Sequence, residues 1–357
     1  RRQRMQITHV EVVPVELDLH VPYPTIEGVE VGRVGAVFVR IETQQGDTAW
    51  GCTAVDPAFT DVTLEEVTRA CRACAARARD LNPINIEYAL AELEGVAGET
   101  RMALCAFDLA FYDLLGLAAR LPLYRLLGGY RQRIQTSITV HRATVQETVA
   151  LARDYARQGF RILKIKSSHD PEEDVHRMSA VRDALPDVIL RLDVEGGYTI
   201  QQTLDVARML EGKLEMIEQP TPADDLEALR EVTQRSAVPI LADESVAGLS
   251  SALEIAGQRA AHGINVKLAA CGGLHCARQM DAIARAAHLA TMVGCVHEPA
   301  LLAAAGLGFA LSSSNVQYSD LDGYMHLGKD PTRAGFYLEE GWLYARDVPG
   351  LGCQVEL

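Results

Sequence analysis

Five charged residues between positions 166 and 267 recur at a nearly constant interval. They are Lys166, Asp193, Glu218, Asp243 and Lys267, separated by 27, 25, 25 and 24 residues. Each lies at the end of a short apolar run typical of a buried strand, such as RILKIK over 161–166. The interval fits one strand plus one helix, so the charges keep step with the strands. We expect these side chains to meet at one end of a parallel sheet.

The three acids of this series predict a metal site. Asp193, Glu218 and Asp243 come from consecutive predicted strands, and carboxylates that converge in a cavity repel one another unless a cation lies between them. Ligation by oxygen alone favours Mg²⁺, with Mn²⁺ next, over Zn²⁺. The sequences EQP and ADES could also serve only to cap the following helices. The regular spacing favours the metal site.

The lysines predict proton transfer. Lys164 and Lys166 share one face of their strand, although such a pair alone would equally suit an exposed edge strand. Lys166 and Lys267 flank the acidic strands from opposite sides, as two bases on opposite faces of a substrate would. A divalent cation on the substrate carboxylate would stabilise the enolate formed when the α-proton leaves. We expect Lys164 and the metal together to lower the pKa of Lys166, and Lys164 could also contact that carboxylate.

The pattern of elements predicts an α/β fold with two parts. Residues 131–325 alternate eight strand candidates with helices, which indicates a (β/α) barrel with its site at the carboxyl ends of the strands. Residues 6–56 alternate like antiparallel strands, and 62–82 and 99–120 have helical periodicity. We therefore expect an α+β capping domain over 1–130, completed by the segment 326–357 returning to it.

Amino-acid composition limits the classes of binding partner and the cellular compartment that we expect. A net charge of −14 and a pI near 5.2 argue against nucleic acid, and no stretch is expected to span a membrane. Eight cysteines in 357 residues suit a reducing, cytoplasmic setting. Cys71 and Cys74 form a C-x-x-C inside a helical pattern without a second ligand pair, so we assign them no metal. The expected partners are a small-molecule substrate and further copies of the chain.

Several motifs together resemble the enolase superfamily, specifically its muconate-lactonizing enzyme subgroup. They are KIK over 164–166, LRLDVEGGY with Asp193, IEQP with Glu218, ADES with Asp243 and INVKLAACGG with Lys267. The resemblance covers nearly the whole chain and implies a barrel of the enolase-superfamily type with an α+β cap, Mg²⁺ and a lysine base. Asp320 and Asp322 resemble the Asp-x-Asp pair with which dipeptide epimerases hold the substrate ammonium, although DLDG is also a good turn sequence.

The resemblance predicts an isomerase that epimerises a dipeptide at its C-terminal residue. Glu195 stands where the family commonly has a neutral amide, and Glu27 and Glu30 occupy the cap loop where an arginine would hold a glutamate side chain. We therefore expect an apolar or cationic C-terminal side chain rather than glutamate. Thr139 and His297 complete the predicted substrate-binding residues.

Other functions remain open. An N-acylamino acid racemase, a cycloisomerase, a succinylbenzoate synthase and a dehydratase of a hydroxylated cyclic imino acid would share the lysines and the metal, and only the pair Asp320 and Asp322 argues against them. His297 could be the base, as in relatives of mandelate racemase, but this requires an aspartate after the sixth strand, where KLAACGG has none. A barrel kept only for binding or structure is disfavoured, because every charged position needed for catalysis is filled.

Overall fold

A long antiparallel sheet forms the base of the cap in this computed structural model, which describes residues 5–24 and 29–357. Its strands run in the order β1 (Ile7–Pro24), β2 (Glu30–Thr43) and β3 (Thr48–Val55). Gly46, in the tight turn between β2 and β3, has φ 88°, a conformation that glycine adopts without steric cost. Val37, Phe38 and Val39 in the middle of β2 are fully buried, so the sheet is covered on both faces.

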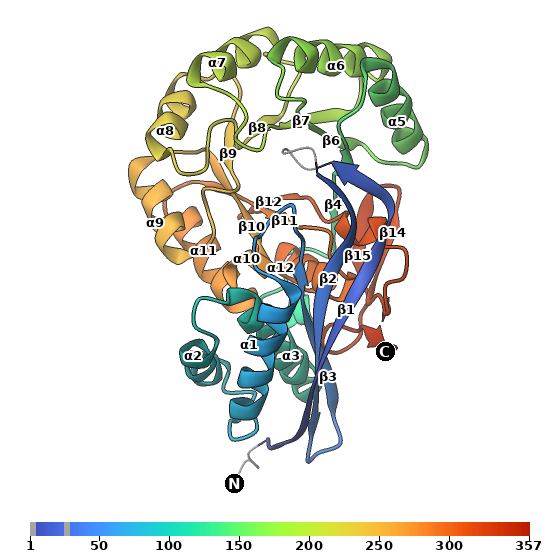
Figure 1. Cartoon of the computed structure of the whole chain (residues 1–357), viewed down its shortest axis with the longest axis vertical. Helices are drawn as coiled ribbons and strands as arrows, with labels where there is room; N and C mark the ends of the chain where they lie inside the picture. Colours follow the sequence, from blue (N-terminus) through green and yellow to red (C-terminus); the bar gives the residue numbers. More distant parts are fainter. Residues whose placement is uncertain (1–4, 25–28) are drawn as a thin grey trace.

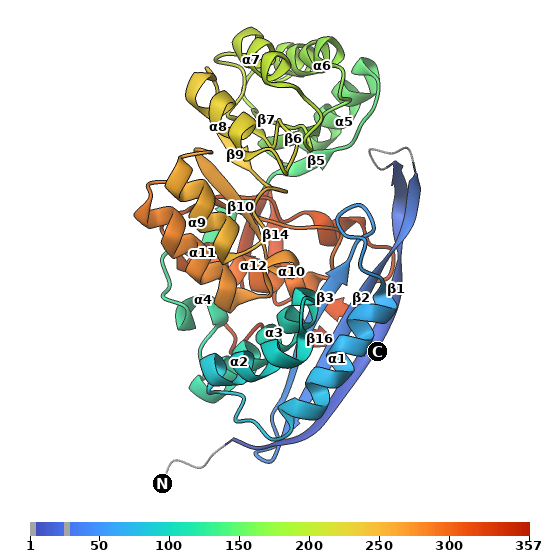
Figure 2. The same cartoon turned by 60° about the vertical axis from the view of Figure 1, so that its left-hand side comes forward.

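Three helices pack beside this sheet (Figures 1 and 2): α1 (Leu64–Ala78), α2 (Ile86–Ala97) and α3 (Arg101–Ala119). Helix α1 begins at a capping box between Thr63 and Glu66, whereas α2 was not predicted. Helix α3 contacts β3 at Gly51, where an added Cβ would lie 1.9 Å from the Ala106 carbonyl oxygen. Contrary to expectation, α3 is long and apolar enough to cross a membrane, but 67% of its most apolar window is buried inside the protein.

Eight parallel strands form the curled sheet of the barrel, as predicted. They are β5 (Ile138–Val140), β6 (Ile162–Lys166), β7 (Ile189–Asp193), β8 (Met216–Glu218), β9 (Ile240–Ala242), β10 (Gly263–Lys267), β11 (Ala290–Gly294) and β12 (Val316–Ser319). Neighbours in sequence are neighbours in the sheet. The two ends of the sheet meet where the Ser137 N–H, just before β5, donates to the Ser319 carbonyl oxygen at 3.0 Å.

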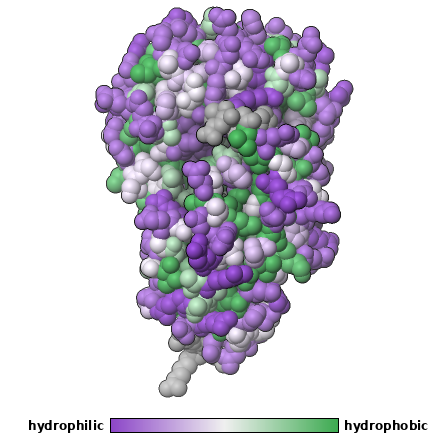
Figure 3. All heavy atoms as spheres, viewed as in Figure 1, coloured by the Kyte–Doolittle hydropathy of each residue, from purple (hydrophilic) through white to green (hydrophobic). Residues whose placement is uncertain are grey.

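Helices connect the strands and cover the outside of the barrel (Figure 2): α5 (Val145–Arg157), α6 (Pro171–Ala184), α7 (Ile200–Met209), α8 (Leu226–Arg235), α9 (Leu249–Gln258), α10 (Leu268–Cys271), α11 (Leu274–Ala286) and α12 (Ala300–Ser312). Hydrophilic side chains cover most of the barrel helices on the face shown in Figure 3. Helix α12 is the exception, since all but its last residue are buried.

The C-terminal segment packs against the cap and the start of the barrel. The short helix η1 (Gly323–His326) leads into it, and it contains β13 (Thr332–Arg333), β14 (Phe336–Glu339), β15 (Trp342–Ala345) and β16 (Gln354–Val355). Strand β15 pairs with β4 (Arg133–Gln135), which follows the short helix α4 (Leu123–Leu126). The Leu351 N–H donates to Asp113 of α3 at 2.8 Å, and the Gly328 N–H to the Asp18 carbonyl oxygen of β1 at 2.7 Å. These contacts hold the C-terminal segment against the cap, and the division at residues 130 and 325 stays a prediction.

Candidate active site

The strand register brings the predicted charged residues to one level of the barrel. Lys166 of β6 pairs with Asp193 of β7, which pairs with Glu218 of β8. Asp243 directly follows β9, and Lys267 is the last residue of β10. All three carboxylates are buried, and none exposes more than 4% of its surface. The positions expected from the spacing therefore converge at the carboxyl ends of the strands, where barrel enzymes build their sites.

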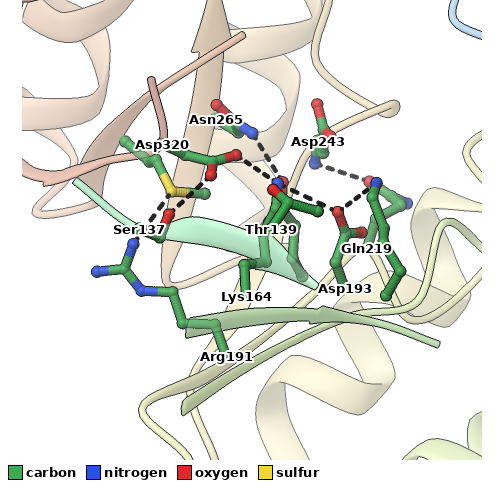
Figure 4. Close-up of polar contacts among 12 residues, drawn as sticks. Ser137, Thr139, Lys164, Arg191, Asp193, Gln219, Asp243, Asn265 and Asp320 are labelled. Atoms are coloured by element: carbon green, nitrogen blue, oxygen red, sulfur yellow. Dashed lines mark hydrogen bonds and ion pairs between the residues drawn. The ribbon is translucent and has the colours of Figure 1, made fainter. Parts of the chain in front are cut away.

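Lys164 lies at the centre of the buried charges (Figure 4). Its ammonium group contacts Asp320 of the last strand and lies 3.3 Å from Asp193 Oδ2 and 3.7 Å from Glu218 Oε2. Burial lowers the pKa of Lys164, but the three carboxylates outweigh burial and hold that pKa well above its ordinary value. Lys164 is therefore a fixed cation that bridges the acidic cluster and the last strand.

The acidic cluster has the donor chemistry of a divalent-cation site. Asp193 Oδ1 and Glu218 Oε2 are buried without a hydrogen-bond partner, which is costly for carboxylate oxygens unless a cation meets them. Glu218 Oε1 accepts from the Asn265 amide at 2.7 Å, and burial together with Asp193 raises the pKa of Glu218 to about 8. Among the described residues no group of three or more His, Cys, Asp or Glu side chains is arranged to hold a metal ion, and the Lys164 ammonium lies near both Asp193 and Glu218. Three carboxylates with two orphan oxygens nevertheless fit an oxygen-ligated ion such as Mg²⁺.

Lys166 is held by two carboxylates. Its Nζ lies 2.8 Å from both Asp193 Oδ2 and Glu195 Oε1, and Arg142 donates to the other oxygen of Glu195 at 2.8 Å. Burial lowers the pKa of Lys166, yet Asp193 and Glu195 outweigh burial and Lys164 and raise that pKa well above its ordinary value. The expected lowering by Lys164 is thus a minor effect in this arrangement. A bound divalent cation would act in the lowering direction.

Glu195 has an uncommon backbone conformation. Its φ is 53°, in the left-handed region that glycine and asparagine favour. A glutamate there is less favourable than the neutral amide common in the family, so its side-chain contacts with Lys166 and Arg142 offer the reason for its presence. The sequence flagged Glu195 as unusual but gave no sign of Arg142, which follows the first barrel strand.

Lys267 enters the same cavity from the other side of the strands that carry the acids. Its Nζ lies 2.6 Å from Asp243 Oδ2 and 4.8 Å from the centre of the Phe59 ring. Burial lowers the pKa of Lys267, and the Asp243 and Glu244 carboxylates more than compensate, so the pKa is raised. Phe59 belongs to the cap loop after β3, so the cap supplies one wall around this lysine.

Asp320 and Asp322 follow the last barrel strand, β12, and line the cavity, but their surroundings differ. Asp320 accepts from Ser137 Oγ at 2.7 Å and from Lys164. Asp322 accepts from the backbone N–H of Thr139 at 2.7 Å and lies 3.6 Å from His326 Nε2. Asp320 is therefore already neutralised by a buried lysine, whereas Asp322 faces a histidine.

A cavity of about 490 Å³ is lined by all three lysines and by Glu195, Glu244, Asp320 and Asp322. Asp193, Glu218 and Asp243 are buried and are not among its lining residues. Its walls come from the barrel strands and from two parts of the cap, around Tyr23 and along the loop 57–61. Thr139 and His297 line it as predicted. Glu30 does not: it is exposed at the start of β2 and is not among the lining residues, and Glu27 lies outside the described residues. The cap acid that does line the cavity and remains exposed is Asp61.

A hydrogen-bonded cluster between cap and barrel was not predicted. Asp56, at the end of β3, accepts from the His297 backbone N–H at 3.1 Å, from His297 Nδ1 at 2.8 Å and from the Tyr23 hydroxyl at 2.5 Å. The Tyr23 ring stacks on the His297 ring with 4.5 Å between centroids. An aspartate that orients His297 thus exists, but it comes from the cap instead of the sixth strand. No local sequence pattern indicates this contact, because Asp56 and His297 are 241 residues apart.

Two family models match most of the chain. Residues 147–356 match the model described as enolase C-terminal domain-like, and residues 7–128 match the N-terminal domain of mandelate racemase and muconate lactonizing enzyme. The chain belongs to the enolase superfamily. This superfamily member is 35% identical to an L-Lys-D/L-Arg epimerase of Desulforapulum autotrophicum, over 98% of this chain and 99% of the relative.

Two solved structures with bound dipeptides are similar to this superfamily member. A dipeptide epimerase of Enterococcus faecalis, complexed with Mg and L-Leu-L-Tyr, has a TM-score of 0.94 and 31% identity, covering 98% of this chain and 99% of the other. A dipeptide epimerase of Methylococcus capsulatus, complexed with Mg and L-Arg-D-Lys, has a TM-score of 0.90 and 31% identity, covering 98% and 100%. The barrel and cap predicted from the sequence are confirmed.

Proposed function

We propose that this protein catalyses a Mg²⁺-dependent 1,1-proton transfer at the carbon next to a carboxylate, and that its substrate is a dipeptide epimerised at the C-terminal residue. One observation carries the proposal: Lys166 of β6 and Lys267 of β10 enter one cavity from opposite sides of the three strands that carry the acids. The full-length similarity to epimerases of dipeptides supports the substrate class.

The lysines exchange protons across the α-carbon. The one in its neutral form takes the α-proton from one face, and the ammonium of the other returns a proton to the opposite face, so that each turnover inverts both the stereocentre and the protonation of the pair. Asp193, Glu218 and Asp243 would hold the cation, which supplies positive charge to the substrate carboxylate and so stabilises the enolate. Lys164 adds a second fixed positive charge at the same place.

Charge complementarity orients the dipeptide in the cavity. The carboxylate end lies at the cation site and Lys164, and the N-terminal ammonium lies at Asp322, since Asp320 already carries a lysine. Near Lys267, the C-terminal side chain meets Phe59 and Asp61 of the cap loop. Asp61 is exposed and has no hydrogen bond or ion pair among the described residues. We therefore infer that the C-terminal side chain of the substrate is cationic or apolar. The acid that supports this inference is Asp61, which lines the cavity, and not Glu30, which does not.

Deuterium incorporation tests the reaction. The protein is incubated in D₂O with Mg²⁺ and a library of L,L-dipeptides, and mass spectrometry measures deuterium at the α-carbon of the C-terminal residue. Lys166→Ala and Lys267→Ala should each abolish epimerisation but retain α-proton exchange for one antipode, a different one in each variant, because one base remains. Loss of exchange for both antipodes in both variants would contradict a two-base mechanism.

Acetylation of the amino terminus tests the substrate class. A good dipeptide substrate should lose at least about tenfold in kcat/KM when N-acetylated, because the ammonium contact is lost. Equal rates on both forms would favour the N-acylamino acid or cyclic imino acid alternatives and leave the proton transfer intact. The side-chain inference predicts that Asp61→Asn lowers the ratio of kcat/KM for a C-terminal lysine over a C-terminal leucine by about tenfold.

Further predictions accompany this function. Mn²⁺ as a substitute for Mg²⁺, assembly into a homo-oligomer and a cytoplasmic location all stay predictions. The last is supported by eight cysteines that are all free thiols.

A further inference from the structure

Three histidines from different barrel loops gather at the end of the cavity that holds Asp322. His141 follows β5, His297 follows β11 and His326 ends η1, and all three line the cavity. Their ring centroids are 5.4 Å apart for His141 and His326, 5.5 Å for His297 and His326, and 6.1 Å for His141 and His297. The reaction proposed above uses none of them. Their position beside the ammonium site therefore needs its own explanation.

His326 has the closest relation to that site. Its Nε2 lies 3.6 Å from Asp322 Oδ2, at ion-pair distance, and has no hydrogen-bond partner in the described residues. Because Lys164 already neutralises Asp320, the state of His326 decides whether this end of the cavity carries a free negative charge. An imidazolium at His326 leaves the end neutral, and a neutral imidazole leaves one negative charge on Asp322.

We propose that His326 is the resident counter-ion of Asp322, with which the substrate ammonium competes, so that a proton on His326 weakens binding of a dipeptide with a free amino terminus. The inference rests on the proposed dipeptide substrate and adds a specificity-determining residue to it. Deprotonated His326 leaves Asp322 free for the ammonium and offers it an uncharged ring edge instead of a like charge.

The surroundings of His326 set the direction of the pH dependence. Burial lowers its pKa, but Asp322 and, more weakly, Asp320 outweigh burial, so the pKa is raised above its ordinary value. His141 behaves differently: burial and the two neighbouring histidines lower its pKa to about 3, so it stays neutral. His297 faces the cluster from β11 and Tyr23 from β1, and α12, packed behind η1, has no titratable side chain.

The raised pKa of His326 determines how KM changes with pH. As pH rises through the pKa of His326, the imidazolium loses its proton and KM for a free dipeptide falls. One proton is involved, so KM changes at most about tenfold per pH unit on this acid limb. At higher pH the substrate amine, with an ordinary pKa of about 7.7–8.0, loses its own charge and KM rises again.

The test is the pH profile of KM between about pH 5.5 and 8.5 for a free dipeptide and its N-acetyl form, with Mg²⁺ saturating. We expect the acid limb in the wild type with the free dipeptide only. His326→Gln should remove the limb, giving KM at pH 6 at least about fivefold below wild type, and His326→Lys, a permanent cation, should keep KM high at every pH. His141→Gln is the matched control, because it alters the same cluster but should leave the limb in place.

Two results would overturn the inference: an acid limb that persists in His326→Gln, or an equal limb with the N-acetyl substrate. Calorimetric binding of the dipeptide at pH 6 and 8 gives the same answer for a variant with low turnover, since binding does not require proton transfer. If the wild type turns over no dipeptide at all, the proposed function fails first. If it turns over dipeptides and His326→Gln keeps the limb, only the role of His326 fails.

Discussion

Substitution of Asp56 should loosen the cap over the cavity. The carboxylate is 3% exposed and accepts four hydrogen bonds, from the Tyr23 hydroxyl, the Ala58 N–H, and both the backbone N–H and Nδ1 of His297. In Asp56→Asn one oxygen becomes an NH₂ group. The hydroxyl or the imidazole can turn to accept from it, but one backbone N–H then loses its acceptor.

The expected cost is that of one buried unsatisfied donor, about 1–3 kcal/mol. A cost of about 2 kcal/mol converts to a change of roughly 30-fold in the population of the closed cap, which is an upper bound for the loss of kcat/KM. Tyr23→Phe should cost only about 1 kcal/mol, because the Asp56 oxygen that it leaves still accepts from Ala58 at 3.0 Å and the ring can still stack on His297.

Steady-state kinetics with a dipeptide and hydrogen exchange of the loop 57–61 measure the two consequences. Faster exchange of this loop should accompany the loss of kcat/KM, in the order Asp56→Asn, Tyr23→Phe, wild type. A loss of kcat/KM well beyond about 100-fold with unchanged loop exchange would refute the reasoning. It would indicate instead that Asp56 acts on the chemistry of His297, as in the mandelate-racemase-like alternative.

Three further predictions concern the barrel. Chelation should abolish turnover, and added Mg²⁺ should restore it. Asp243→Asn should cost at least about 100-fold in kcat and Glu244→Gln much less. The reverse order would make Glu244, instead of Asp243, the third metal ligand. Glu195→Gln should slow α-proton exchange about tenfold for one antipode only, the one served by the lysine that it holds, whereas equal slowing of both antipodes would contradict a positioning role. Arg191→Met should lower the free energy of unfolding in urea by about 1.5–3 kcal/mol, because this buried arginine donates a charge-assisted hydrogen bond at 2.7 Å to Glu215, whose side chain is 28% exposed; an unchanged midpoint would argue against it.

The sequence predicted the barrel and its charged ring because both follow from periodicity. Strand-end residues such as Asp193 and Lys267 repeat with the βα unit, and parallel strands place such residues on one rim regardless of the detailed packing. The same rule would have drawn attention to His141, which directly follows β5, had histidines been included with the acids and lysines.

Contacts between cap and barrel could not be predicted in this way. The ring of Phe59 over Lys267 and the bonds from His297 to Asp56 depend on how the cap sits on the rim, and no local pattern encodes that placement. The expectation for Glu30 failed for the same reason: one strand position decides whether a cap residue faces the cavity or the solvent. Specificity was therefore the part of the function that the sequence constrained least.

The balance of charge explains why lysines flank the three consecutive acids on the rim. Each lysine ammonium lies against at least one carboxylate: Lys164 against Asp320, Lys166 against Glu195 and Lys267 against Asp243. Glu218 has no such partner within 3 Å, and Asp193 keeps an orphan oxygen, so the unneutralised charge collects where the cation is proposed to bind. At the far end the charge of Asp322 is matched only when His326 carries a proton. A zwitterionic dipeptide thus meets a site whose two ends differ in sign once the cation is bound, and this difference rather than shape alone sets its direction in the cavity.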